Sequence, residues 1–377
     1  MTATFLQRLS AVMTGLQKEE HLLLALPWDE PKEQMQRIRK RFPYVKISYH
    51  QSKYGSSYWK GREPMPPEFF ESGTILATLW ALPATQGDAP NLRLIHFFSA
   101  GVDHVVDNPI YRDSDITLTT SSGIHGPQIA EWVVMTALAS GHKLSKLLAW
   151  QRERHWGSLQ ELGPVRDNVG QRLGVLGYGS IGRQVARVAK AMGTDVIAYT
   201  ASPRPSKESK KDHGFVVPGT GDPDGELPSA WYSGHKKEEL HHFLRQNIDI
   251  LLVSVPLTTG TTHLLGKEEF DILGKSRNAF ISNISRGPIL RQDDLIAALK
   301  ASPEEGGLRG AALDVADPEP LPADNELWSL PNVILSPHIS GGSTLYVDRC
   351  FQVLEENLAR LEKGQKLINV VDRKKGY

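Results

Sequence analysis

RLGVLGYGSIGRQVARVAKAMGTDVIAYT, residues 172–200, is the stretch that decides the fold. Its pattern predicts a strand, a glycine-rich turn, a helix and a second strand, which is the order of a βαβ unit. The turn follows the spacing GxGxxG. Glycine permits a tight turn and close backbone approach, and a helix N-terminus presents N–H groups, so this arrangement is typical of a site for a dinucleotide pyrophosphate. The motif residues expected to contact that cofactor are Gly177, Gly179, Ser180, Ile181 and Gly182.

Near-continuous apolar runs follow the motif and extend the same sheet. Such runs are expected when a parallel sheet is covered on both faces. The alternation of strands and helices lapses only in residues 201–237, which are rich in Pro, Gly, Ser and charge and predict a long loop or insertion. The strands expected in this part of the chain are 172–179, 195–200, 248–256, 279–285, 309–315 and 332–338.

The first hundred or so residues predict a second α/β domain with a parallel sheet. Its expected strands are 21–28, 44–50, 74–80 and 92–102, with a helix at 30–43. The opening residues, 1–20, favour a surface helix over an import peptide. The segment 127–150 has apolar residues on more than one helical face, so we expect one long helix between domains or subunits. Residues 345–371 predict a helix, stopped by glycine, that folds back onto the first domain.

Composition excludes several classes of protein. The chain has 377 residues, 43 basic against 43 acidic, and one cysteine, Cys350. The length predicts two domains. The balanced charge shows no excess of basic residues of the kind that binds nucleic acid or an anionic membrane. A single cysteine excludes an internal disulfide and leaves no thiol set for structural zinc, so we expect no metal and a reducing, cytoplasmic location. Charges interrupt every apolar run before the roughly 20 residues of a membrane span.

Polar residues follow the strands where ligands bind in an open parallel sheet, beyond the carboxyl ends. Ser285 and Arg286 follow one predicted strand, Asp314 ends the next with Glu319 in the loop after it, and His338 ends the last. Taken singly, each has an ordinary interpretation as a surface ion pair, a solvated turn residue or a satisfied polar group. Together they suit hydride transfer between a 2-oxo acid and a 2-hydroxy acid, with a guanidinium for the carboxylate and a proton donor for the carbonyl oxygen.

The end of the second strand bears on the choice of cofactor. An NAD site usually offers Asp or Glu to the ribose there, but this sequence has Thr200, and Asp195 stands at the opposite end of the strand. Ser202, Arg204 and Lys207 follow. A missing carboxylate with cations nearby favours NADP(H) over NAD(H), the alternative being solvated loop residues in an NAD site.

The chain resembles the D-isomer-specific 2-hydroxyacid dehydrogenases, including glyoxylate/hydroxypyruvate reductases, over nearly its whole length. The blocks that carry the resemblance include LRLIHFFSAGVDHV, IAEWVVMTALA, LGVLGYGSIGRQVA, VPLTTGTTHLLG, NISRGPILRQDDL, ALDVADPEPL, SPHISGGST and INVVDRKKGY.

The resemblance implies a catalytic set and a domain plan. It makes Arg286, Glu319 and His338 the catalytic triad, with Asp314 on the nicotinamide amide. It implies a flavodoxin-like substrate domain (1–120 and 345–377), a Rossmann domain (121–344), a cleft between them and a homodimer built through the long helix. Backbone N–H groups of Ala100, Gly101 and Val102 are then expected to hold the substrate carboxylate, and Val255, Pro256, Ser285 and Gly341 to lie beside the cofactor.

The sequence departs from the family at several positions, and other functions remain as alternatives. Trp132 and Ser254 replace histidines common in the family. Trp80, Leu82 and Phe98 line a pocket larger than glyoxylate needs or are simply core residues. A phosphoglycerate dehydrogenase would be expected to add a regulatory domain after Tyr377, and a formate dehydrogenase to have Gln where Glu319 stands. A dinucleotide-sensing scaffold or corepressor is the rival outside enzymes, because fold alone does not fix function.

Overall fold

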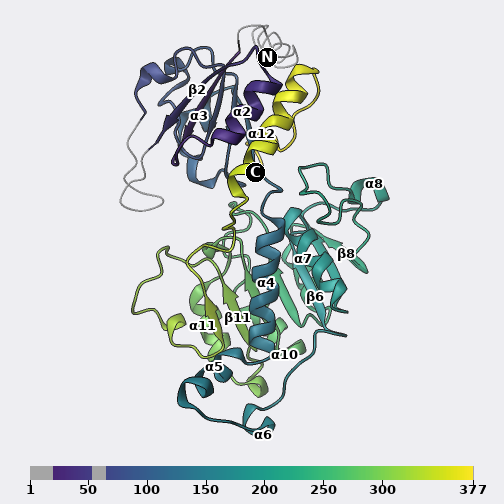
Figure 1. Ribbon diagram of the computed structural model, residues 1–377. Coiled ribbons are helices and arrows are strands. Elements are labelled where there is room, and N and C mark those ends of the chain that lie inside the picture. Colours follow the sequence, from purple (N-terminus) through teal and green to yellow (C-terminus); the bar gives the residue numbers. More distant parts are fainter. Residues whose placement is uncertain (1–19, 53–64, 377) are drawn as a thin grey trace. The chain divides into compact units, whose positions relative to one another are not determined.

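The computed structural model describes residues 20–52 and 65–376. The chain divides into two compact units: unit 1 contains Met1–Ile124 and Thr344–Tyr377, and unit 2 contains His125–Ser343. Each unit is built on a parallel sheet with helices against it (Figure 1), which confirms the predicted fold class. The surface helix expected at the start of the chain lies outside the described residues. None of the helices within 20–52 and 65–376 is both long and apolar enough to cross a bilayer.

The sheet of unit 1 has the strand order β2-β1-β3-β4-β5, with parallel pairing throughout. Four of its strands overlap the predicted segments, with β2 extending one residue past its segment, whereas the fifth was not expected from the sequence. Three of the four residues of that strand are threonine, so the apolar run that marks a buried strand is missing. The bounds are β1 (His21–Leu26), β2 (Lys46–Gln51), β3 (Ile75–Thr78), β4 (Leu94–Phe97) and β5 (Thr117–Thr120).

The C-terminal segment returns to unit 1, as its sequence predicts. Its helix α12 (Tyr346–Glu362) packs on α2 (Lys32–Arg41), and a short α3 (Pro109–Asp113) precedes β5. Arg37 of α2 pairs with Asp348 at 2.8 Å and with Glu355 at 2.6 Å. Polar contacts therefore join residues more than 300 positions apart in the sequence.

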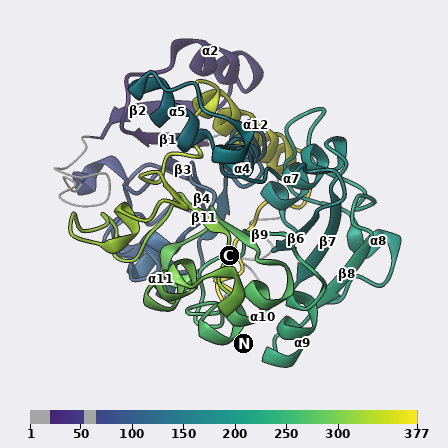
Figure 2. The same ribbon diagram turned by 90° about the horizontal axis from the view of Figure 1, so that it is seen from below.

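The sheet of unit 2 has the order β12-β11-β10-β9-β6-β7-β8, again all parallel. Figure 2 shows α4 and α7 on one face of this sheet and α9, α10 and α11 on the other. Because side chains alternate along a strand, Val175 packs on the α4 and α7 side and its neighbour Leu176 on the opposite side. The bounds are β6 (Arg172–Leu176), β7 (Asp195–Thr200), β8 (Ala230–Ser233), β9 (Ile250–Val253), β10 (Phe280–Asn283), β11 (Gly310–Leu313) and β12 (Val333–Leu335).

The long helix predicted for 127–150 is two helices. The chain leaves the first at Gly141, and Lys143 adopts a left-handed φ of 56° before the second begins. A residue in this conformation cannot continue an α-helix, so the two helices run in different directions. The helices of unit 2 are α4 (Gly126–Gly141), α5 (Leu144–Glu153), α6 (Leu159–Leu162), α7 (Ser180–Ala191), α8 (Lys207–Lys210), α9 (Lys237–Leu244), α10 (Lys267–Arg277) and α11 (Gln292–Lys300).

The segment 201–237 is more ordered than the predicted loop. It contains α8 and the edge strand β8, which pairs with β7. The segment is also fastened to the glycine motif and its helix. The Tyr178 hydroxyl donates to the Asp222 carboxylate at 2.7 Å, and the buried Arg183 guanidinium donates to the backbone oxygens of Asp222 and Lys210.

Candidate active site

The glycine motif has the shape that a dinucleotide requires. Gly177 has φ of +101°, and a Cβ there would lie 2.7 Å from the backbone of Ser254. A Cβ at Gly182 would lie 2.6 Å from the Gly177 oxygen, whereas one at Gly179 would meet nothing within 4 Å. The outer glycines therefore permit close packing, and the middle one leaves open space at the N-terminus of α7, where Ser180 and Ile181 begin the helix. These features fit a pyrophosphate held against backbone N–H groups.

The end of β7 carries no carboxylate. The Thr200 hydroxyl donates to the Ser202 oxygen at 2.8 Å, and Asp195 pairs with Arg172 at the other end of the strand. The half-buried Arg204 donates from Nη1 to the Ser209 oxygen at 2.7 Å. Its Nε is buried without a hydrogen-bond partner among the described residues. One hydrogen bond to Ser209 therefore holds the Arg204 guanidinium, and its Nε–H donor has no partner among the described residues.

The predicted cofactor residues of the other strands lie at the same, carboxyl edge of the sheet. Ser285 follows β10, and its hydroxyl donates to the backbone oxygen of Val255, which follows β9 and precedes Pro256. Gly341 follows β12, and a Cβ there would lie 3.1 Å from the ring of His125. Ser254 replaces the expected histidine and donates to the Gly177 oxygen at 2.8 Å, which ties the glycine turn to β9.

Glu319 and His338 form a direct pair. The His338 Nδ1 atom lies 3.1 Å from Glu319 Oε2, and Glu319 Oε1 accepts from the Ala316 N–H at 3.1 Å. Burial acts to raise the pKa of the Glu319 carboxyl. The hydrogen bond and charge of His338, the Ala316 N–H and the charge of Arg286 outweigh burial, so the pKa is lowered from its ordinary value. The carboxyl therefore stays ionised beside the imidazole.

Arg286 is carried by a loop that touches the loop of Glu319. Its Nη1 donates to the Ser285 oxygen at 2.8 Å, and its own backbone oxygen accepts from Asn283 at 3.1 Å. A Cβ on the next residue, Gly287, would lie only 1.9 Å from the Ala316 oxygen. Glycine at this position lets the two loops come together, so Arg286, Glu319 and His338 share one electrostatic environment.

Asp314 has a set of partners that the sequence did not reveal. Oδ1 accepts from the Ser336 hydroxyl at 2.6 Å and the Ile339 N–H at 2.9 Å, and Oδ2 accepts from the N–H and the hydroxyl of Ser340. The residue is buried, and its backbone oxygen accepts from the N–H of His338 at 2.8 Å. The Asp314 carboxylate therefore holds the loop of His338, and the contact with a nicotinamide amide stays a prediction. Ser336 and Ser340, two residues before and two residues after His338, are the sequence features from which these hydrogen bonds could have been predicted.

The residues predicted to bind the substrate carboxylate lie in unit 1. Ala100 is exposed, Val102 is buried, and the Gly101 oxygen between them accepts from the Ser99 hydroxyl at 2.7 Å. They form the loop that follows β4.

Of the aromatic and apolar residues noted in the sequence, two lie in a hydrophobic core and two are only partly buried. Phe98 is fully buried against Phe351, as a core residue. Trp80 and Leu82 are only partly buried against the core of unit 1. Trp132 lies in the core of unit 2.

Comparison with known proteins identifies the family. The model of the D-isomer specific 2-hydroxyacid dehydrogenase NAD-binding domain matches residues 134–218 and 224–340, more than half of the chain. A glyoxylate reductase from Korarchaeum cryptofilum is 29% identical over 289 residues, 76% of this chain and 77% of that protein. A glyoxylate/hydroxypyruvate reductase A from Salmonella paratyphi B is 28% identical over 327 residues, 85% of this chain and 90% of that protein.

A solved structure shares the whole fold. The D-isomer specific 2-hydroxyacid dehydrogenase from Xanthobacter autotrophicus Py2, solved with NADPH and MES, superposes with a TM-score of 0.71 at 24% identity, covering 95% of this chain and 100% of that one. The family model spans the glycine motif, Arg286, Glu319 and His338. The chain therefore belongs to the D-isomer specific 2-hydroxyacid dehydrogenase family of nicotinamide-dependent oxidoreductases.

Proposed function

We propose that this chain reduces a small 2-oxo acid to the D-2-hydroxy acid with His338 as the general acid, glyoxylate and hydroxypyruvate being the first substrates to test. The observation that carries the proposal is the Glu319–His338 pair at the carboxyl edge of the dinucleotide sheet, with Arg286 acting on the same carboxylate. A base or acid oriented by a second group is the arrangement that proton transfer to a carbonyl needs.

The proposed roles combine the Glu319–His338 contact with the roles that the family resemblance implies. The nicotinamide, when bound, supplies the hydride. Because the His338 Nδ1 atom faces Glu319, Nε2 is the atom assigned to donate the proton to the substrate oxygen. The Glu319 carboxylate fixes the tautomer and orientation of the ring. Arg286 binds the substrate carboxylate and polarises the carbonyl, and the N–H groups of residues 100–102 are assigned to the same carboxylate.

Substitution of His338 tests the catalytic assignment. His338→Ala should lower kcat about 100- to 10,000-fold, the usual contribution of general acid–base catalysis, while the Kd for NADPH stays within about twofold because the glycine motif is untouched. Steady-state kinetics and fluorescence titration measure the two quantities. His213→Ala, which removes an exposed histidine of the 201–237 segment, is the matched control. An unchanged kcat in His338→Ala excludes the assignment.

The cofactor is proposed to be NADP(H) in preference to NAD(H). The support is the absence of a carboxylate at Thr200 and the presence of the half-buried Arg204 guanidinium in the loop after β7. A guanidinium there suits a 2′-phosphate, whereas a carboxylate would repel it. Arg204→Glu should raise the KM for NADPH at least tenfold while changing that for NADH by less than threefold. Equal changes for the two cofactors would remove this proposal.

A substrate panel separates the enzyme from a non-catalytic dinucleotide sensor on the same fold. Glyoxylate, hydroxypyruvate and bulkier 2-oxo acids are assayed with NADPH and with NADH in parallel. The proposal expects turnover with at least one of the two small acids. Tight NADPH binding without turnover of any 2-oxo acid would favour the sensor.

We also propose a homodimer, built through α5, the second half of the predicted long helix, and the residues that follow it. Residues 144–159 expose several apolar side chains that nothing in the described chain covers fully. The exposed fractions are 43% for Leu144, 38% for Leu147, 41% for Leu148, 100% for Trp156 and 83% for Leu159. An apolar surface of this kind is typical of a protein–protein contact.

A further inference from the structure

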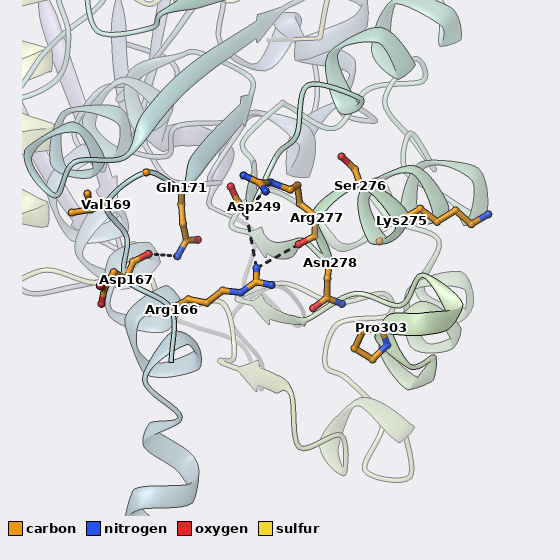
Figure 3. Close-up of a pocket in the computed structure, with 12 residues that line it drawn as sticks. Arg166, Asp167, Val169, Gln171, Asp249, Lys275, Ser276, Arg277, Asn278 and Pro303 are labelled. Atoms are coloured by element: carbon orange, nitrogen blue, oxygen red, sulfur yellow. Dashed lines mark hydrogen bonds and ion pairs between the residues drawn. The ribbon is translucent and has the colours of Figure 1, made fainter. Parts of the chain in front are cut away.

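Unit 2 has a polar pocket at the amino edge of its sheet. The pocket has a volume of about 580 Å³ and is lined by the segment before β6, by Asp249 before β9 and by the last turn of α10 (Figure 3). Its walls carry Arg166, Lys275 and Arg277. The glycine motif and the Glu319–His338 pair belong to the carboxyl ends of the strands, so this pocket is separate from the dinucleotide site.

Two guanidinium groups share one carboxylate at the floor of the pocket. The side chain of Asp249 is buried, and its Oδ1 atom lies 3.5 Å from Nε of Arg277 and 3.9 Å from Nη1 of Arg166. The other oxygen accepts from the N–H of Arg172 at 2.9 Å. Figure 3 shows Arg166 reaching between Asp249 and Arg277. Since a single carboxylate faces two cations, one positive charge in this group is uncompensated.

A third guanidinium lies close to the backbone of the same aspartate. Nη2 of Arg309 donates to the Asp249 backbone oxygen at 3.4 Å, while Nε and Nη1 are buried with no hydrogen-bond partner among the described residues. Burial, together with the charge of Arg166, lowers the pKa of the Arg309 guanidinium to about 10. The larger effect is the cost of burying a charge and the second is repulsion by Arg166, while the charge of Asp249 opposes both. Lys275, exposed on the rim, is the third cation that lines the pocket, whereas Arg309 lies outside the lining.

The negative groups nearby do not neutralise this excess. The C-terminus of α10 carries a partial charge of about −0.5, less than the charge of one of the three lining cations. The Asp167 carboxylate is directed away from Arg166 in Figure 3. Glu304 and Glu305 keep their charges and bond to Ser302, and neither is among the residues that line the pocket. Among the lining residues, three cations, Arg166, Lys275 and Arg277, outnumber the two carboxylates of Asp167 and Asp249.

We infer that this pocket binds a small molecule bearing a phosphoryl or pyrophosphoryl group. Guanidinium groups match phosphate oxygens in geometry, and Arg166 and Arg277 can receive such a group while still facing Asp249. Ser276 and Asn278 add polar side chains to the wall. The volume lies in the usual range for small-molecule sites, about 300–1,000 Å³, and exceeds what a bare phosphate ion fills. The ligand class is therefore an organic phosphate or a pyrophosphate.

The test is calorimetric titration of the full chain with inorganic pyrophosphate in the presence of saturating NADPH. NADPH occupies the glycine motif, so pyrophosphate binding reports on another site. The wild-type protein should bind saturably, and Arg277→Ala and Lys275→Glu should each weaken the affinity at least tenfold. Arg112→Ala, which removes an exposed guanidinium of unit 1, should leave it within twofold. The affinity should also fall as salt is raised, because the cations are partly exposed.

Three outcomes overturn the inference: no saturable binding by the wild-type protein, equal affinity in the wild type and both pocket variants, or an equal loss in Arg112→Ala. The NADPH affinity of each variant, unchanged because the opposite sheet edge is intact, shows that it has folded. Should Arg277→Ala fail to fold, Lys275→Glu decides alone, since its side chain is exposed. A failed substrate assay with intact pyrophosphate binding would contradict the proposed function without touching this site.

Discussion

At the scale of single residues, Asp314 is expected to act on catalysis through His338. His338 has a left-handed φ of 56°, which side chains rarely adopt, and its loop is held by the four donors on the Asp314 carboxylate. Asp314→Asn replaces one acceptor with an NH₂ group that faces N–H and O–H donors. We expect kcat to fall about 10- to 100-fold with little change in NADPH affinity. Unchanged kcat, or an equal loss in kcat and NADPH affinity, would contradict this positioning role.

Glu319 leads to a prediction about pH. Its pKa in the folded protein is lowered from the ordinary 4.5, so its ionised contacts stabilise the fold above about pH 4.5 and this stabilisation is lost as the pH falls through the lowered value. Glu319→Gln should therefore destabilise the protein at pH 6, by about 1 kcal/mol or less for so exposed a pair, and by less at pH 3. Urea unfolding at the two pH values measures the difference. If Glu319→Gln loses more unfolding free energy at pH 3 than at pH 6, the predicted direction of the pH dependence is wrong.

At the scale of elements, the contacts between α7 and the 201–237 segment should stabilise the fold. Arg183→Met leaves the buried backbone oxygens of Asp222 and Lys210 without their donor, which should cost about 2–4 kcal/mol. Tyr178→Phe removes one hydrogen bond to Asp222 and should cost about 1 kcal/mol. Arg187→Met is the control, since that exposed side chain makes one longer bond, 3.3 Å, to Gly221. Denaturant unfolding measures the loss of unfolding free energy in the three variants. A loss in Arg187→Met as large as that in Arg183→Met would refute the stabilising role of these contacts.

The elements also show what the sequence could and could not predict. Central strands such as β6 and β9 are apolar runs because both faces are covered, so they were found. The missed strands, β5 and β8, are short edge strands with polar or intermediate residues. The strand-end rule brought Glu319 and His338 together correctly, since it depends only on topology. The partners of Asp314 and the break at Lys143 depend on left-handed backbone conformations of non-glycine residues, which composition and periodicity do not encode.

At the scale of the whole molecule, unit 2 divides its polar chemistry between the two edges of one sheet. The carboxyl edge holds the glycine motif and the Glu319–His338 pair, and the amino edge holds the cationic pocket around Asp249. The strands between them are apolar and buried, so the two polar regions are separated by the length of the sheet. This separation is why NADPH binding at the carboxyl edge serves as the folding control for the variants of the pocket at the amino edge.

The assembly of the whole molecule is tested through the exposed apolar residues of 144–159. A stable dimer buries roughly 1,200–2,000 Å² in total, and large apolar side chains dominate its energy. Trp156 and Leu159 are the most exposed in the segment, so Trp156→Asp combined with Leu159→Asp should weaken dimerisation at least 100-fold, as measured by sedimentation velocity over a concentration series. Val106→Asp, at an exposed apolar position of unit 1, should leave the dimer intact. A wild-type protein that sediments as a monomer at micromolar concentration, or a double variant that still dimerises with the wild-type constant, would refute this interface.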